Sequence, residues 1–211
     1  MARLTNLVLR CPFTLLMLAV LIAAGISGQS HIGSLNVDIH RQLGHSPRLM
    51  FEGHLHRPVT SLYFTAGGWS FYRSLLMFAA SVGWAEHDHG TRRAALAFFG
   101  IHLATLLIMA IAIALSLSML ATLRGELLFN VRDVEPSGGN YGCLGVMIAG
   151  LCCWKRNAAA SIITLVLLVR LTSSTMHLPE AGRMMSADLA HLIAFPLGLL
   201  CHRISQEESA S

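Results

Sequence analysis

Long apolar runs alternate with polar stretches along the whole chain. Six of these runs are long enough for buried or membrane-crossing helices, since about 20 apolar helical residues span the ~30 Å hydrocarbon core of a bilayer. They cover residues 12–26, 69–84, 94–120, 138–154, 158–172 and 187–201. The pattern predicts an all-α polytopic membrane protein, with six transmembrane helices in one domain over residues 1–211.

The polar stretches differ in length and character. Residues 27–68 are rich in histidine but also contain apolar clusters, which indicates a loop with short helices at the bilayer surface. Residues 202–211 form a polar tail that is expected to fray. Basic residues before the first run and small residues after it are also typical of a cleaved signal peptide, so removal of that run is an open alternative.

The composition favours a membrane protein over a soluble one. Hydrophobic residues make up 54% of the chain and charged residues 12%, with a mean hydropathy of +0.60, whereas soluble domains carry about 25% charged residues. The net charge of +4 comes from basic residues scattered singly or in pairs, so nucleic acid is not an expected partner. Their density is highest before the first run and in the second and fourth connections, which predicts that both termini are cytoplasmic.

Two polar residues stand out at the starts of apolar runs. Ser137 precedes the fourth run and His191 lies one turn inside the sixth, so the two helices run in the same direction and both residues lie near the same side of the bilayer. A histidine within reach can activate a serine hydroxyl as a nucleophile, and a helix N-terminus favours a developing oxyanion. Gly138 and Gly139 remove side chains where a substrate carbonyl would approach. Alternatively, Ser137 is an ordinary helix N-cap and His191 bonds a neighbouring carbonyl.

Two short motifs surround these residues. The sequence SGGNYG places Tyr141 four positions after the serine, and AHLIAFPLG extends from Ala190 to Gly198. Both resemble motifs of the rhomboid family of intramembrane serine proteases, which carries G-x-S-G with a following aromatic residue and, later, A-H-x-x-G-x-x-x-G. The resemblance covers nearly the whole chain and is closest to short bacterial rhomboid-like proteins.

This resemblance implies a six-helix rhomboid-like bundle in a bacterial inner membrane. It implies a Ser137–His191 dyad, with Tyr141 against the imidazole and the oxyanion received by backbone N–H groups around Ser137 and Gly138. Asn140 is a candidate for further support of the oxyanion. The substrates would be transmembrane proteins, with membrane lipids as surroundings and no metal or organic cofactor. Three small residues, Gly142, Ala194 and Gly198, would allow the helices that carry Ser137 and His191 to pack closely.

The chain departs from the family pattern at two places. Glu135 and Pro136 stand where the family has its glycine and the next residue. On the second helix the family carries H-x-x-x-N, whose side chains bind the oxyanion, and the matching positions here are Phe71 and Leu75. A non-catalytic rhomboid-like protein that binds membrane helices is therefore an alternative from a different functional class.

Other polar residues have ordinary interpretations. Loop histidines such as His54, His56 and His87 allow a small transporter or metal-handling protein as a third reading, although solvated histidines explain them more simply. Arg73 and Arg170 are expected to extend to the bilayer interface. His102 lies within the third apolar run and is expected to be buried and bonded to a neighbouring helix. Asp188 lies three residues before His191, so it either orients the imidazole or matches the helix dipole as an acid of the first turn.

Overall fold

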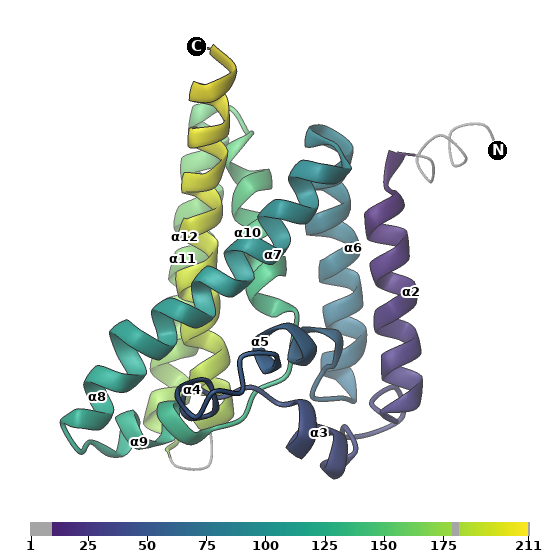
Figure 1. Ribbon diagram of the computed structural model, residues 1–211. Coiled ribbons are helices and arrows are strands. Elements are labelled where there is room, and N and C mark those ends of the chain that lie inside the picture. Colours follow the sequence, from purple (N-terminus) through teal and green to yellow (C-terminus); the bar gives the residue numbers. More distant parts are fainter. Residues whose placement is uncertain (1–9, 179–181, 211) are drawn as a thin grey trace.

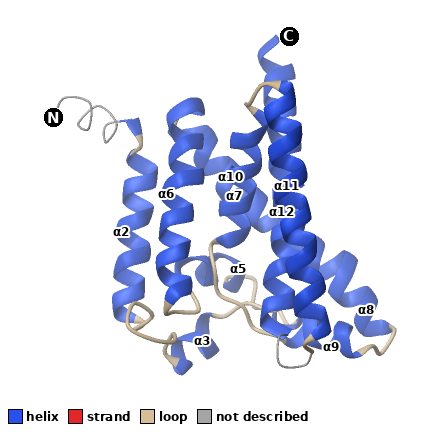
Figure 2. Cartoon of the chain, turned by 180° about the vertical axis from the view of Figure 1, so that it is seen from behind, coloured by secondary structure: helices blue, strands red, loops and turns tan. Residues whose placement is uncertain are grey.

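The computed structural model describes residues 10–178 and 182–210, so Arg3 and Ser211 lie outside the described residues. Helices make up 80% of the structure, and the described residues contain no strand, which confirms the all-helical prediction. The long helices run between two ends of the molecule, and the start of α2 and the end of α12 lie at the same end (Figure 1). Figure 2 shows the same arrangement from behind. These helices are α2 (Pro12–Ser27), α6 (Trp69–His89), α7 (Thr91–Ile108), α10 (Ser137–Ala149), α11 (Cys153–Met176) and α12 (Gly182–Ala210).

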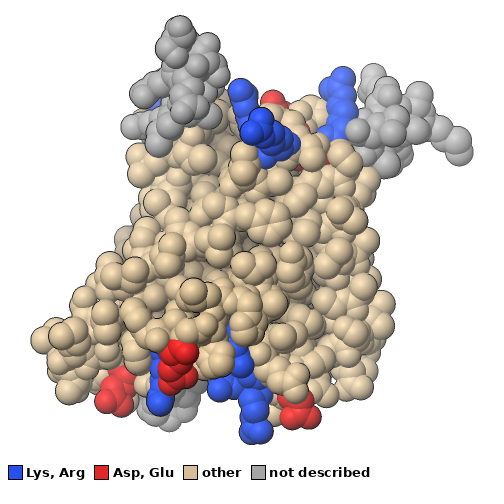
Figure 3. Space-filling view, viewed as in Figure 1, with Lys and Arg blue, Asp and Glu red and all other residues tan. Residues whose placement is uncertain are grey.

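Three stretches of the described chain are long and apolar enough to cross a membrane. They are Thr91–Met119, with a mean hydropathy of 2.4, and Cys153–Met176 and Gly182–His202, each with 1.6. Figure 3 shows basic side chains at the two ends of the visible face and an uncharged band between them. Helix α10 has 13 residues, about 20 Å at ~1.5 Å per residue. The structure therefore supports a membrane protein, and the full set of six spans stays a prediction.

Several helices extend beyond the predicted ends. The predictions ended each helix where its apolar run ends, but polar residues can continue a helix. Helix α6 continues through the polar WAEHDH segment to His89 and stops at Gly90, whose φ is +82°. Helix α12 begins at Gly182 and continues to Ala210. The backbone of residues 202–210 is thus helical, and fraying of the polar tail stays a prediction.

The predicted third helix, residues 94–120, is not uniform. Helix α7 passes into a π-helical segment, Met109–Leu115, and then into the short α8, Ser116–Met119. The chain turns at Ala121 and forms α9, Leu123–Asn130, whose N-cap is Thr122. This region lies at the end of the molecule opposite the end of α12 (Figure 1).

The long first loop folds over that same end. It contains α3 (Val37–Leu43), α4 (Pro47–Phe51), α5 (Arg57–Thr60) and the 3-10 turn Ser61–Tyr63. His45 exchanges two backbone hydrogen bonds of 2.9 and 2.7 Å with Asp133, just before α10. His102 of α7 lies 3.2 Å through Nε2 from the carbonyl oxygen of Pro58, so its partner is in this loop and not in a long helix. These bonds fix the loop against the start of α10.

Helices α10 and α12 are in direct backbone contact. A Cβ atom added to Gly198 would overlap the carbonyl oxygen of Gly142, and one added to Gly145 would overlap the carbonyl oxygen of Phe195. Ala194, also on this face, is completely buried. The small residues therefore let the two helices approach to a distance that no larger side chain allows.

A buried carboxylate joins three helices at the other end. Glu86 of α6 is only 1% exposed and accepts hydrogen bonds from the backbone N–H groups of Phe13 and Thr14, at 2.9 and 2.7 Å. It also accepts from the hydroxyl groups of Thr14 and Thr91, at 2.7 and 2.8 Å. The N-cap residue of α2, Cys11, supplies no side-chain cap. Glu86 therefore caps α2 from a neighbouring helix.

We expect Glu86→Gln to lower the free energy of unfolding by about 1–2 kcal/mol. The amide has one acceptor oxygen in place of two and turns an N–H₂ group toward donors. Unfolding by an anionic detergent in mixed micelles measures the effect. Asp88→Asn makes the same chemical change at an exposed acid of the same helix and should leave stability unchanged. Equal effects of the two substitutions would contradict the capping role.

Candidate active site

Ser137 is the first residue of α10 and is largely buried, with 9% of its surface exposed. The cap position falls on Pro136, whose carbonyl oxygen accepts the first helical bond from the N–H of Asn140 at 3.1 Å. Ser137 is thus placed one residue inside the helix rather than at the N-cap. Its hydroxyl group hydrogen-bonds the Glu135 side chain, and the first N–H groups of the helix have no partner within the helix.

His191 lies in α12 at the same end and is 3% exposed. Its ring is stacked on Tyr141, with ring centroids 4.0 Å apart and planes inclined by 23°. Neither Nδ1 nor Nε2 has a hydrogen-bond partner in the described part of the chain, so Ser137 does not bond either nitrogen atom. Asp188 Oδ1 is 3.9 Å from Nδ1, which is beyond hydrogen-bond range. The imidazole is therefore held by an aromatic ring and keeps both nitrogen atoms available.

Ser137 and His191 line one small cavity of about 30 Å³. That volume is on the order of one water molecule. Asn140 also lines it, is 1% exposed, and has no partner for either its amide oxygen or its amide nitrogen. The unpaired polar atoms converge here, although a buried polar group without a partner usually costs about 1–3 kcal/mol. The remaining lining residues include Ser70, Arg73, Ser74, Met77, Glu135 and Arg170.

Two hydroxyl groups of α6 face this cavity at positions that the sequence analysis missed. Phe71, matched to the family's histidine, instead packs against Gly25 of α2. The residues that line the cavity are Ser70, just before Phe71, and Ser74, just before Leu75. They are four residues apart, as in the H-x-x-x-N motif. Ser74 Oγ is buried without a partner. The polar pair on α6 is therefore offset by one residue, and only its spacing could have indicated it.

Charged side chains also gather around the cavity. Arg170 Nη2 of α11 lies 2.6 Å from Asp188 Oδ1, and Asp188 is 2% exposed. The Ser70 hydroxyl donates to Glu135, and Arg73 Nη2 lies 3.5 Å from the same hydroxyl. Arg170, which was expected to extend to the bilayer interface, pairs with a buried acid on the next helix, and its side chain is 35% exposed. Opposite charges on two neighbouring apolar helices were the available signal.

The acids before α10 bind protons more strongly than free carboxyl groups. Burial raises the pKa of Glu135, while the Ser70 and Ser137 hydroxyls and the charges of Arg73 and Arg170 act in the opposite direction. Burial and the nearby Glu135 raise the pKa of Asp133 to about 7. A protonated Glu135 would carry no negative charge toward an oxyanion formed at Ser137.

The two glycines after Ser137 face α7 rather than open space. A Cβ on Gly139 would overlap the ring of Phe98, and one on Gly138 would lie 3.1 Å from His102 Nδ1. Their lack of side chains therefore lets α10 pack closely on α7. This is a packing role, in addition to any access that they give to a substrate.

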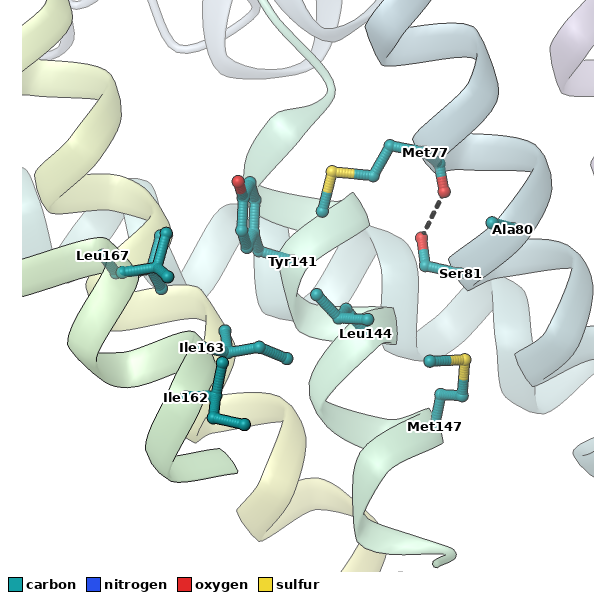
Figure 4. Close-up of a pocket in the computed structure, with 10 residues that line it drawn as sticks. Met77, Ala80, Ser81, Tyr141, Leu144, Met147, Ile162, Ile163 and Leu167 are labelled. Carbon is teal, nitrogen blue, oxygen red and sulfur yellow. Dashed lines mark hydrogen bonds between the residues drawn. The ribbon is translucent and has the colours of Figure 1, made fainter. Parts of the chain in front are cut away.

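An apolar pocket of about 350 Å³ adjoins the site between α6, α10 and α11 (Figure 4). Tyr141 lines it, together with Met77 from α6 and Leu167 from α11. The ring of Tyr141 thus separates an apolar space from the polar cavity of Ser137 and His191. Outside this region, His54 and His56 contact each other with ring centroids 6.1 Å apart. The described residues contain no group of three His, Cys, Asp or Glu side chains placed to hold a metal ion.

Comparison with known proteins finds no match: no family model fits the chain, and neither a curated protein nor a solved structure is similar to it. The resemblance to rhomboid proteases therefore rests on the sequence motifs alone.

Proposed function

We propose that the protein is an intramembrane serine endopeptidase of rhomboid type, which cleaves transmembrane proteins near the bilayer surface in a bacterial inner membrane. One observation carries the proposal. Ser137 and His191 line the same small cavity, with both imidazole nitrogen atoms unpaired and the ring stacked on Tyr141. A purely structural histidine of this burial would be expected to bond a neighbouring polar group.

In the proposed reaction, Ser137 Oγ attacks the peptide carbonyl of a client while His191 takes its proton and then gives it to the leaving amine. The hydrogen bond between Ser137 and His191 would form as the client enters, since such bonds are often long in unliganded enzymes. Ser74 Oγ, Asn140 Nδ2 and the first N–H groups of α10 are the donors available to the oxyanion. The apolar pocket beside Tyr141 suits the apolar residues of a client.

A fluorophosphonate probe tests the proposal directly. The probe forms a bond from phosphorus to the oxygen of an activated serine and loses fluoride, so an intact mass measurement detects one added phosphonyl group. We expect labelling of the wild-type protein in detergent micelles and none in Ser137→Ala or His191→Ala. Labelling that persists in Ser137→Ala, or that is absent from the wild type, would count against the proposal.

Asn140 gives a second test that separates chemistry from stability. We expect Asn140→Ala to lower cleavage about 10²-fold, as the loss of one oxyanion donor does. The free energy of unfolding should stay the same or rise, because the amide makes no hydrogen bond that folding would lose. Cleavage assays in proteoliposomes and detergent unfolding measure the two effects. Asn157→Ala, at an exposed asparagine of α11, should change neither; unaltered cleavage by Asn140→Ala would remove Asn140 from the mechanism.

A non-catalytic protein that binds membrane helices is the second candidate, and one observation favours it. Glu135 occupies part of the cavity and accepts a hydrogen bond from Ser70, one of the groups that would face an oxyanion. An ionised carboxylate there opposes negative charge on the substrate. This candidate predicts neither labelling nor cleavage by any form of the protein, together with capture of transmembrane segments by wild type and Ser137→Ala alike.

A further inference from the structure

A larger cavity lies at the opposite end of the molecule from Ser137. It has a volume of about 440 Å³ and lies between α7 and α12, with Ala85 of α6 and Val146 of α10 among its lining residues. His89 and Arg92 mark its position near the connection between α6 and α7, at the end of the molecule where α2 begins and α12 ends (Figure 1). The cavity is distinct from the candidate active site and shares no residue with it.

The mouth of this cavity is cationic, and among the described side chains no acid pairs with its arginines. Arg92 and Arg93, in the first turn of α7, are exposed and form no ion pair within the described residues, and that turn contains no acid. Two acids near the end of α6 have other partners, since Glu86 caps α2 and Asp88 lies 2.9 Å from His87. Two histidines, His89 and His202, add to the lining, with ring centroids 5.3 Å apart.

The rest of the cavity is apolar and follows α7 toward the uncharged middle of the molecule. Ala97 lines it, and Gly100 and Ile101 line it one turn later. At Gly100 an added Cβ would meet no atom within 4 Å, so the space beside this residue is open. Cationic groups at the membrane-surface end and an apolar wall below them match the two parts of an amphiphile with an anionic head.

We propose that this cavity binds an anionic phospholipid of the surrounding bilayer. The phosphate group lies between Arg92, Arg93 and His89, and one acyl chain lies along Ala97 and Gly100. A zwitterionic lipid brings its own cation to the same place and gains less from the arginines, whereas basic pockets between membrane helices favour anionic head groups. The site is independent of the proposed protease function.

Native mass spectrometry of the purified full-length protein tests this proposal, with phosphatidylglycerol and phosphatidylcholine of identical acyl chains as probes. We expect phosphatidylglycerol to bind about tenfold more tightly, which corresponds to about 1.4 kcal/mol. The double variant Arg92→Gln/Arg93→Gln should lose at least this preference. Arg41→Gln/Arg124→Gln removes the same charge from exposed arginines outside the cavity and should bind like the wild type. Equal affinity of the wild type for both lipids would overturn the proposal.

The apolar part of the site has its own test. Gly100→Leu places a side chain in the open space where the acyl chain lies, so it should weaken phosphatidylglycerol binding about tenfold while the protein remains as stable as the wild type. Unaltered binding by Gly100→Leu would overturn the proposed chain position. Competition by sn-glycerol 3-phosphate alone would identify a free phosphate site and contradict a lipid site; we expect no competition.

Discussion

Ser137→Ala is expected to lower the rate of cleavage of a single-span substrate in proteoliposomes by at least about 10³-fold. Alanine removes the only oxygen at the start of α10 that can attack the carbonyl within this cavity. His191→Ala should cost about as much, because without a base the serine stays protonated. The double variant should be no slower than either single variant, since residues that act as one unit are not additive. Initial rates over a panel of substrates measure all three.

A matched control is available on α6. Ser81 is also a buried helical serine, with its hydroxyl bonded to the carbonyl oxygen of Met77 at 2.7 Å (Figure 4). Ser81→Ala should leave the cleavage rate within about threefold of the wild type, because this serine faces the apolar pocket and no base. Cleavage that persists in both Ser137→Ala and His191→Ala would exclude the dyad. No cleavage by the wild type on any substrate would favour the non-catalytic candidate.

The direction of the helices explains why part of this site could be predicted from the sequence. Ser137 and His191 each lie near the start of an apolar run, and the number of runs between them makes the two helices parallel, so the residues reach equal depth. The helical class follows just as directly from apolar runs that are too long for strands. These inferences need only the order and length of the runs.

The rotation of each helix about its axis could not be predicted in this way. Neighbouring helical positions differ by about 100°, so a one-residue error moves a side chain to another face. A helix with apolar residues on most faces gives no stripe to fix its rotation. The match to Phe71 and Leu75 therefore missed Ser70 and Ser74, which the structure turns toward the cavity. The pairing of Arg170 with an acid on α12 depends on the same unknown rotation.

Contact between α10 and α12 leads to the second large effect. We expect Gly198→Ala to lower the free energy of unfolding by about 3–4 kcal/mol, near the upper range for overpacking. The new methyl group would overlap the carbonyl oxygen of Gly142, a backbone atom that cannot move without displacing its helix. The helices must separate, and Ser137 then moves away from His191. Detergent unfolding should show the lost stability, and fluorophosphonate labelling should fall with it.

The same substitution at Gly100 separates this contact from general effects of glycine. Gly100 lies on an open face of α7, so Gly100→Ala should leave stability unchanged or raise it by up to about 1 kcal/mol through better helix propensity. Labelling of Ser137 should also be unaffected. If Gly198→Ala were as stable as Gly100→Ala, the helices would not be held at backbone contact, and the small residues could not be the reason that Ser137 and His191 share a cavity.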